Sequence, residues 1–241
     1  MFTGLVETIG VLRRRAGGTV ARAFVEANLG PLVLGESISV NGACLTVDRI
    51  AEGGFEVDMS SETLAKTTLG ELPLGSRVHL ERAMPLGGRM GGHMVLGHVD
   101  GIGRVTERSP RGDALRLSVE VEGALAQFLA SKGSVTLDGV SLTVNALRDS
   151  GRGRSSVTVF EVMLVPHTLG RTMLGDLRPG ARVNVEVDVL ARYVARQREV
   201  ARAAAAEESG WGEEKSSNRD AYHHDEPDER LLAKLRSGGF L

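Results

Sequence analysis

Three side-chain types in this sequence could carry nucleophilic or proton-transfer chemistry, and two of them hold equivalent places in a repeated segment. Cys44 lies in VNGACLTVDRI (40–50) and Ser141 in the similar LDGVSLTVNAL (137–147). A thiol is nucleophilic even when mostly protonated, although a lone cysteine is more often a small buried hydrophobic residue. His98 could act as a general base, because imidazole exchanges protons near neutral pH, or it could be a loop histidine hydrogen-bonded to the backbone. Because Cys44 and Ser141 hold equivalent positions in the repeat, we favour a functional role for Cys44 over that of a small buried hydrophobic residue.

The similarity between the two segments extends over most of the chain, in the same order in both halves. GLVETIGVL (4–12) matches GHVDGIGRV (97–105), SETLAKTTLGEL matches PHTLGRTMLGDL, and LGSRVHLE matches PGARVNVE. The offset grows gradually along the chain, as loop insertions would produce. A tandem duplication explains this pattern, and we expect two similar domains, residues 1–92 and 93–188.

Short runs of alternating polar and apolar residues, broken by Gly, Pro and acidic turns, fill the chain to about residue 187. Period-2 alternation indicates strands, and about six runs per half can close a small barrel with an interior filled by side chains. The predicted fold class is therefore all-β, a tandem pair of small closed Greek-key-like β-barrels with a C-terminal helix. Inside the repeats, helical periodicity is found in EGALAQFLASKG (122–133) and near residues 62–68.

The C-terminal part of the chain departs from the strand pattern. Residues 189–206 have apolar side chains near helical spacing and arginines opposite them, which predicts a helix whose apolar face packs on a partner. Residues 207–241 begin as a polar, acidic stretch, which predicts disorder. Their amphipathic end, ERLLAKLRSGGFL, is either a docking peptide or a frayed helix.

Composition limits the classes of function. The formal net charge is -2, with 41% hydrophobic and 25% charged residues, which is typical of a soluble globular protein and gives no basic excess to attract nucleic acid. The single cysteine cannot form an internal disulfide and fits a reducing compartment, so we expect a cytoplasmic protein. The start MFTGLVETIG lacks the pattern of a signal peptide, and no apolar stretch is long enough to span a bilayer. We expect no membrane role.

Metal and cofactor sites are not expected either. His93, His98, His223 and His224 have no Cys pair or carboxylate at a ligand spacing around them. GLVETIG and GIGRV contain glycines without the strand–loop–helix context of a nucleotide site.

Several motifs together resemble the riboflavin synthase alpha chain. They are the start MFTGLVE, the paired NGACLTV and DGVSLTV, the segment GGHMVLGHVDG and the twin turns TTLGEL and TMLGDL. The similarity covers about residues 1–200, and residues 207–241 lie outside it.

The resemblance implies a transferase that acts on two molecules of one substrate. In that reaction two molecules of 6,7-dimethyl-8-ribityllumazine dismutate to riboflavin and 5-amino-6-(ribitylamino)uracil by transfer of a four-carbon unit, and no cofactor is consumed. A duplicated barrel would supply two similar pockets. The resemblance also implies a homotrimer, with each reaction site between the N-terminal barrel of one chain and the C-terminal barrel of its neighbour, and with the helices at 189–206 packed together. Docking of the C-terminal segment to a lumazine synthase shell is a further hypothesis.

The resemblance assigns residues to both pockets, where backbone amides and a few hydroxyls are the expected donors to the ring. The N-terminal pocket is expected to contain Cys44, Leu45, Thr46, Asp58, Met59, Ser60, Ser61, Glu62, Thr63, Gly97, His98 and Val99. The C-terminal pocket is expected to contain Gly4, Leu5, Val6, Lys132, Ser141, Leu142, Thr143, Leu164, Val165, Pro166, His167, Thr168 and Leu169. Thr46 and Thr143 could instead be strand threonines chosen for β-propensity.

The expected catalytic residues are Cys44, His98, Ser141 and Asp188. Transfer requires removal of a proton from the C7 methyl group of one molecule, a role for His98, and addition of a nucleophile to C7 of the other, a role for Cys44. Asp188, or Glu186 beside it, could orient a base or bind ribityl hydroxyls, or could lie solvated at the strand end.

Two further features bear on the chemistry. Lys132 could balance negative charge on the pyrimidine or cap the preceding helix. The thiol of Cys44 in one pocket and the hydroxyl of Ser141 in the other could let one molecule act as donor and the other as acceptor, a hypothesis that fails if exchanging the two side chains leaves turnover unchanged.

A non-catalytic alternative is a lumazine- or flavin-binding antenna protein with the same duplicated fold. Such relatives are expected to lack the extreme N-terminal residues and those of the second pocket. This sequence has residues of both kinds and those expected to react, which favours catalysis: Phe2, Thr3, Cys44, His98, Ser141 and Thr143.

Overall fold

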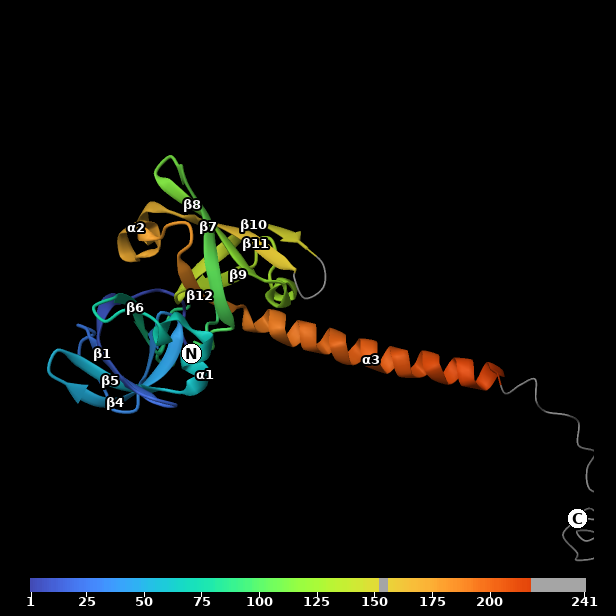
Figure 1. The fold of residues 1–241 in the computed structure, drawn as a ribbon, viewed down its shortest axis with the longest axis horizontal. Helices are drawn as coiled ribbons and strands as arrows, with labels where there is room; N and C mark the ends of the chain where they lie inside the picture. Colours follow the sequence, from blue (N-terminus) through green and yellow to red (C-terminus); the bar gives the residue numbers. More distant parts are fainter. Residues whose placement is uncertain (152–155, 218–241) are drawn as a thin grey trace, which may run out of the picture. The chain divides into compact units, whose positions relative to one another are not determined.

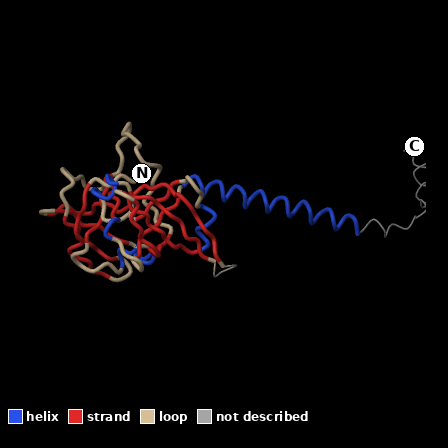
Figure 2. Tube along the Cα trace, turned by 90° about the horizontal axis from the view of Figure 1, so that it is seen from above, coloured by secondary structure: helices blue, strands red, loops and turns tan. Residues whose placement is uncertain are grey.

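The computed structural model describes residues 1–151 and 156–217, with side chains described up to residue 206. The chain divides into two compact units, the first of which runs from Met1 to Ala195 and holds all of the described strands. Figure 2 shows that strands dominate this first unit. The expected all-β class is confirmed.

The first unit contains two closed barrels of six antiparallel strands each (Figure 1). The N-terminal barrel closes in the order β1-β2-β5-β4-β3-β6, and the C-terminal barrel in the order β10-β11-β8-β7-β12-β9, which is the same topology. The N-terminal strands are β1 (Thr8–Gly17), β2 (Ala21–Glu26), β3 (Ser37–Val40), β4 (Ala43–Ala51), β5 (Gly54–Met59) and β6 (Arg77–Arg82). The C-terminal strands are β7 (Gly101–Arg111), β8 (Ala114–Glu122), β9 (Ser134–Leu137), β10 (Val140–Ser150), β11 (Val157–Leu164) and β12 (Arg182–Val187).

Each barrel has its own apolar core, because alternate side chains of every strand point inward. Phe55 and Val57 are fully buried in the N-terminal core, and Phe160 and Val162 are fully buried in the C-terminal core. The pairing of β1 with β2 shifts in register between Leu12 and Arg14, and the pairing of β7 with β8 shifts at the equivalent point, between Val105 and Glu107. Such bulges bend a strand and help a short sheet to close.

The repeated segments at 40–50 and 137–147 are not single strands throughout. Each begins at the end of one strand, makes a two-residue turn and continues as the next strand. The turns are Asn41-Gly42 and Asp138-Gly139, and all four residues have a positive φ. Asn-Gly and Asp-Gly are the usual sequences of such hairpin turns, because they tolerate this conformation.

Short helices follow β5 and β11, as expected for 62–68. They are α1 (Ser61–Lys66) with η1 (Thr68–Gly70), and α2 (Pro166–Arg171) with η4 (Leu174–Asp176). The helix predicted over 122–133 was wrong in extent, because only a 3₁₀ segment, η2 (Gly123–Phe128), is present. The chain must turn back into β9 at Ser134, and Lys132 has a positive φ that ends any helix before that point.

The C-terminal helix α3 spans Val189–Ser217 and therefore continues past residue 206, where the sequence predicts its end. Four glutamates and a lysine among residues 207–217 favour a helix even where aliphatic side chains are missing, and the disorder prediction gave this too little weight. The remainder of the predicted disordered tail, 218–241, lies outside the described residues, and so does its amphipathic end. No helix within the described ranges combines the length and apolar content that a bilayer crossing requires.

The two hairpin turns meet where the barrels contact each other. A Cβ added to Gly42 would lie 2.8 Å from the backbone nitrogen of Gly139, and the reverse distance is also 2.8 Å. Asp138 is only 7% exposed at this contact. Burial raises the pKa of Asp138 from its ordinary value of 3.8 to about 7, a shift that its hydrogen bond from Asn184 N only partly opposes.

We expect Asp138→Asn to stabilise the protein at neutral and higher pH. Between pH 3.8 and about 7 the unfolded chain loses this proton while the folded chain keeps it, so stability falls as pH rises through that window. The full difference is about 4 kcal/mol, and Asn, which already holds the equivalent position 41, carries no such dependence. Chemical denaturation at pH 4 and pH 8 measures the effect. Asp113→Asn, at an exposed carboxyl group, is the control, and parallel pH profiles for wild type and Asp138→Asn would contradict the prediction.

Candidate active site

The outer surface of β4 presents two of the expected site residues. Leu45 points into the N-terminal core and is 5% exposed, whereas Cys44 is half-buried and Thr46 exposed on the opposite side of the strand. The same alternation in β10 buries Leu142 and leaves Ser141 half-buried and Thr143 exposed. The chemically active side chains therefore lie on the outside of each barrel, and the two leucines belong to the cores.

Each of these outer surfaces is met by an irregular segment from elsewhere in the chain. Cys44 N donates a hydrogen bond to Gly97 O at 2.9 Å, and Ser141 N donates one to Gly4 O at 2.8 Å. Residues 96–99 thus lie against β4, and residues 3–6 lie against β10. We call β4 with 96–99 the N-terminal face, and β10 with 3–6 the C-terminal face.

The approach of both segments requires glycine. Gly97 and Gly4 have φ values of 77° and 75°. A Cβ on Gly97 would lie 2.6 Å from Cys44 Cβ, and a Cβ on Gly4 would lie 2.6 Å from Ser141 Cβ. Only a residue without a side chain allows this contact in this conformation.

Two buried carboxylates anchor the segments. Glu81 at the end of β6 accepts hydrogen bonds from Thr3 N at 2.6 Å, Thr3 Oγ1 at 2.7 Å and Gly4 N at 3.0 Å. Glu186 in β12 accepts from Leu96 N at 2.8 Å and Gly97 N at 3.0 Å. Burial raises the pKa of both Glu81 and Glu186, while the hydrogen bonds from the segments oppose that shift.

The segments carry their expected residues to the two faces. Val99 packs against the N-terminal core, and His98 beside it is exposed. Val6 packs against the C-terminal core, and Leu5 beside it is 50% exposed. The structure therefore brings His98 and Val99 to the neighbourhood of Cys44, and Leu5 and Val6 to that of Ser141.

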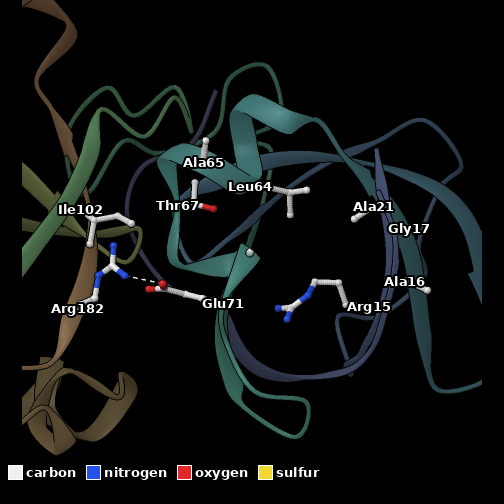
Figure 3. Close-up of a pocket in the computed structure, with 11 residues that line it drawn as sticks. Arg15, Ala16, Gly17, Ala21, Leu64, Ala65, Thr67, Glu71, Ile102 and Arg182 are labelled. Atoms are coloured by element: carbon white, nitrogen blue, oxygen red, sulfur yellow. Dashed lines mark hydrogen bonds and ion pairs between the residues drawn. The ribbon is translucent and has the colours of Figure 1, made fainter. Parts of the chain in front are cut away.

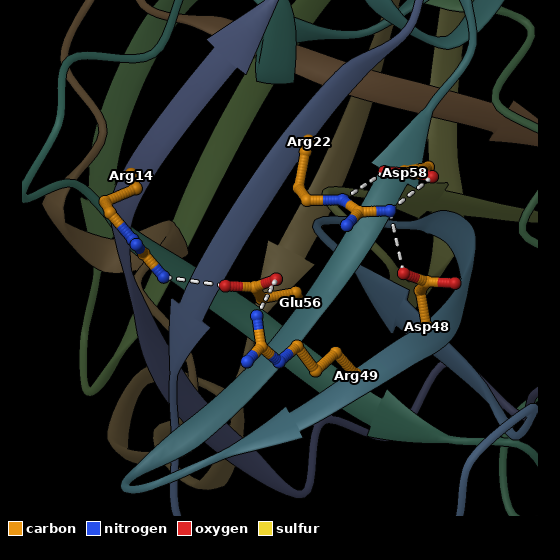
Figure 4. Close-up of polar contacts among 6 residues, drawn as sticks. All are labelled: Arg14, Arg22, Asp48, Arg49, Glu56 and Asp58. Atoms are coloured by element: carbon orange, nitrogen blue, oxygen red, sulfur yellow. Dashed lines mark hydrogen bonds and ion pairs between the residues drawn. The ribbon is translucent and has the colours of Figure 1, made fainter.

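Some expected residues have side chains engaged elsewhere. Arg22 donates to both carboxylate oxygens of Asp58, at 2.9 and 3.0 Å, and also to Asp48 (Figure 4). The hydrogen bond from Arg22 lowers the pKa of Asp58. Met59 and Leu164 are buried in the two barrel cores, at 1% and 0% exposure. Asp58 is thus a partner in an exposed ion pair, and the other two are packing residues.

The remaining candidates of the helical segments lie at the surface. Ser60 caps α1, accepting a hydrogen bond from Thr63 N at 3.1 Å. In the C-terminal barrel, α2 begins at Pro166. The exposed members of these segments are Ser60, Ser61, Glu62, Val165, Pro166 and His167, while Thr63, Thr168 and Leu169 are half-buried.

Lys132 and Asp188 border the C-terminal barrel. Lys132 is exposed and its backbone N donates to Val144 O at 2.7 Å. Asp188 lies between β12 and α3, where its Oδ1 accepts a hydrogen bond from Leu190 N at 2.9 Å. Asp188 therefore caps the start of α3, and its charge also acts on His93.

His93 is a site residue that the sequence did not predict beyond its inclusion among possible metal ligands. Its Nδ1 lies 2.7 Å from Ser141 Oγ, and its Nε2 is buried without a hydrogen-bond partner among the described residues. Burial lowers the pKa of His93, and the nearby Asp188 partly opposes this. No hydrogen bond of the Cys44 thiol is found in the described part of the chain, so the two faces differ in the partner of the nucleophilic atom as well as in its type. The only signal in the sequence was the recurrence of histidine in GGHMVLGH.

A cavity of about 400 Å³ lies at the junction of the barrels and is lined by residues from both of them. Figure 3 shows Arg15 and Leu64 on its N-terminal side and Arg182 paired with Glu71 across it. None of the expected site residues lines it, and its charged groups are already paired, because Arg15 also donates to Leu69 O and Leu72 O. Within residues 1–151 and 156–217, no group of three or more His, Cys, Asp or Glu side chains could hold a metal ion.

Comparison with known proteins identifies relatives of this duplicated fold. The riboflavin synthase of Mycobacterium tuberculosis is 46% identical over 81% of this chain and 97% of its own length. Those of Brucella abortus and Bacillus subtilis are 41% and 39% identical, again over 81% of this chain, and over 97% and 89% of their own lengths. These relatives confirm the expected resemblance to riboflavin synthases, and with it the expectation of an enzyme.

Solved structures and a family model agree with the fold. The crystal structure of LumP complexed with riboflavin matches with a TM-score of 0.66 at 24% identity, over 78% of this chain and 99% of that one, and LumP complexed with 6,7-dimethyl-8-(1'-D-ribityl) lumazine matches with 0.65. The model of the lumazine binding domain matches residues 3–83 and 96–188. Because these two segments coincide with the two barrels, the chain belongs to the lumazine-binding domain family.

Proposed function

We propose that the protein is a riboflavin synthase, which converts two molecules of 6,7-dimethyl-8-ribityllumazine into riboflavin and 5-amino-6-(ribitylamino)uracil. The observation that carries this proposal is the pair of equivalent outer faces, each formed by one repeat and one crossing segment. A reaction between two identical molecules requires two similar binding surfaces. The similarity to enzymes named riboflavin synthase, over most of their length, supports the same conclusion.

Each face, together with the helical segment of the same barrel, would bind one lumazine molecule. The residues involved are Thr46 and the segment 60–63 in the N-terminal barrel, and Thr143 and the segment 165–169 in the C-terminal barrel. Both strands present half-buried residues beside exposed ones, which suits a flat ring that packs on one side and forms hydrogen bonds at its edge. Holding two reactants in alignment can contribute about 7 to 11 kcal/mol, so positioning is the larger part of the proposed catalysis.

Proton transfer and nucleophilic addition would fall to the few reactive groups at the faces. His98 would remove the proton from the C7 methyl group of one molecule, and the resulting carbanion is delocalised into the electron-poor ring. Cys44 or Ser141 would contact C7 of the other molecule, and His93 would hold the Ser141 hydroxyl in place. No step needs a cofactor.

Both faces are open in a single chain, and we infer that they close against each other in a homotrimer. Leu190, Tyr193 and Val194 form a stripe at helical spacing on α3 and are 61%, 70% and 59% exposed. A stripe of exposed aliphatic and aromatic side chains on a helix is stabilised by packing on other helices. Arg192, by contrast, forms an ion pair with Asp100 and lies over the ring of Phe128, so that side of the helix is already occupied.

A charge placed in this stripe should break the trimer. We expect Leu190→Glu to reduce the particle from three chains to one and to abolish turnover with it, because each proposed site needs two chains. Leu86→Glu is the matched control, since Leu86 is fully exposed in the segment between β6 and β7 and receives the same substitution. Light scattering after size-exclusion chromatography measures the mass, and a wild-type protein with the mass of one chain would contradict the trimer.

The function itself is tested by adding purified protein to the lumazine alone and following riboflavin by absorbance. Formation of riboflavin without added cofactor supports the proposal. Binding with a shifted absorption but no product would instead place the protein with the antenna class.

A further inference from the structure

Besides the glutamate that anchors a crossing segment, β6 and β12 each bury one more polar side chain, and these two occupy equivalent positions. His79 in β6 is 2% exposed, and Asn184 in β12 is 1% exposed. Buried polar side chains are almost always hydrogen-bonded, and the partners of these two show what they hold in place.

The backbone of each residue is fixed to the hairpin turn of its own barrel. His79 N donates to Asn41 Oδ1 at 2.7 Å, and Asn184 N donates to Asp138 Oδ1 at 2.8 Å. Asn41 N and Asp138 N donate in return to His79 O and Asn184 O, each at 2.9 Å. These bonds leave both side chains free to reach the other barrel.

The imidazole of His79 crosses to the C-terminal barrel and makes two hydrogen bonds there. Met173 N donates to His79 Nε2 at 2.8 Å, and Nδ1 lies 3.0 Å from Asp138 O. Because a backbone N–H can only donate, Nε2 accepts, so the proton sits on Nδ1 and is donated to the carbonyl of Asp138.

Asn184 makes the mirror arrangement in the N-terminal barrel. Its Nδ2 donates to Asn41 O at 2.7 Å, and Thr68 N donates to its Oδ1 at 2.7 Å. Thr68 and Met173 are equivalent residues, since each lies in the turn after the short helix of its barrel.

The two amides held in this way are adjacent to the helices of the proposed binding faces. Thr67, next to Thr68, donates from Oγ1 to Thr63 O of α1 at 2.6 Å. Thr172, next to Met173, donates from Oγ1 to Thr168 O of α2 at 2.8 Å. Each of the two side chains therefore holds a backbone amide whose preceding residue is hydrogen-bonded to a helix of the opposite barrel.

We propose that His79 and Asn184 are positioning residues, each of which fixes the helical segment of the lumazine-binding face on the opposite barrel. His79 of the N-terminal barrel positions α2, and Asn184 of the C-terminal barrel positions α1. The two faces of one chain are thereby set by a single buried network and cannot shift independently. This inference rests on the proposed function for the role of the faces, but the contacts it describes can be tested without any ligand.

Amide hydrogen exchange of the full-length protein, without lumazine, tests the crossed arrangement. His79→Ala should accelerate exchange at Met173 and through 172–176 about tenfold, the effect of losing one buried hydrogen bond, while 67–71 exchanges as in wild type. Asn184→Ala should give the reverse pattern, with faster exchange at Thr68. Acceleration confined to the barrel that carries the substitution would overturn the proposal, and so would an unchanged rate at Met173.

Two conservative variants separate the two bonds of His79. The side-chain amide of His79→Gln reaches about as far as Nε2 and should restore protection of Met173. The amide of His79→Asn reaches only to the position of Nδ1, so Met173 should exchange as fast as in His79→Ala. If His79→Ala accelerates exchange of all amides through loss of global stability, the comparison of His79→Gln with His79→Asn tests the proposal instead. Equal protection of Met173 in these two variants would overturn it.

The same variants link the network to binding. His79→Ala is expected to raise KM for the lumazine about tenfold with a smaller change in kcat, and His79→Gln to recover most of that loss. If the variants show faster exchange in the barrel opposite the substitution but the wild-type protein has no turnover, the contacts are supported and the proposed function is rejected. Normal turnover with normal exchange in His79→Ala would reject the positioning role alone.

Discussion

Gly97→Ala is expected to remove nearly all activity, whereas Gly87→Ala should leave it near the wild-type level. Both glycines have a positive φ, 77° for Gly97 and 80° for Gly87, so alanine is strained at both positions by about 1–3 kcal/mol. A Cβ on Gly87 meets nothing within 4 Å, but on Gly97 it overlaps Cys44 Cβ at 2.6 Å and Cys44 N at 2.8 Å. The added overlap should cost a further 1–3 kcal/mol, about the usual cost of overpacking.

The folded Gly97→Ala protein should also lose activity, because the substitution moves the segment that carries His98 away from β4. We expect kcat/KM to fall about 100-fold or more, since small displacements of reacting groups have effects of that size. Thermal unfolding and steady-state kinetics of both variants, at a temperature where both are folded, measure the two effects. Equal effects of Gly97→Ala and Gly87→Ala would mean that the contact with Cys44 does not matter.

Removal of the Ser141–His93 pair should have the second large effect. We expect Ser141→Ala and His93→Ala each to lower kcat about 100-fold, the size of effect that follows when a group in contact with the reacting atoms is lost or displaced. The double variant should be little worse than either single variant, because the residues act as a unit through the 2.7 Å contact between Nδ1 and Oγ.

Ser118→Ala is the control for this pair. Ser118 is a buried serine of the same barrel, and its Oγ has no hydrogen-bond partner among the described residues, so its loss should leave kcat unchanged. Additive losses in the double variant would show that Ser141 and His93 act separately. The double variant with Cys44→Ser and Ser141→Cys tests whether the thiol and the hydroxyl determine which lumazine molecule is donor and which is acceptor. Unchanged turnover in this variant would contradict that hypothesis.

The sequence predicted the duplicated barrels because strand alternation and turn residues are local signals that recur in both halves. The pairs Cys44 with Ser141 and Thr46 with Thr143 followed from the same repetition. Their position on the outside of the barrels also fits the alternation, since the leucine between each pair is buried.

Other features depend on contacts between distant residues, which local patterns do not encode. The Ser141 contact with His93 and the anchoring of Thr3 by Glu81 join residues 48 and 78 positions apart. Asp58 resembled a ligand contact in sequence, yet its side chain is held by Arg22 from the neighbouring strand. The buried hydrogen-bond network left one signal in the sequence, a polar residue at the same position in RVHLE (His79) and RVNVE (Asn184). The sequence does not show that each of these side chains contacts the other barrel.

The central claim is that two identical molecules react at two equivalent faces, and product stoichiometry tests it most directly. The purified protein would be incubated with 6,7-dimethyl-8-ribityllumazine, without cofactor or metal, and substrate and both products would be quantified by chromatography. We predict one riboflavin and one 5-amino-6-(ribitylamino)uracil for every two lumazine molecules consumed. Tight binding without either product, or riboflavin formed in any other ratio, would contradict the account.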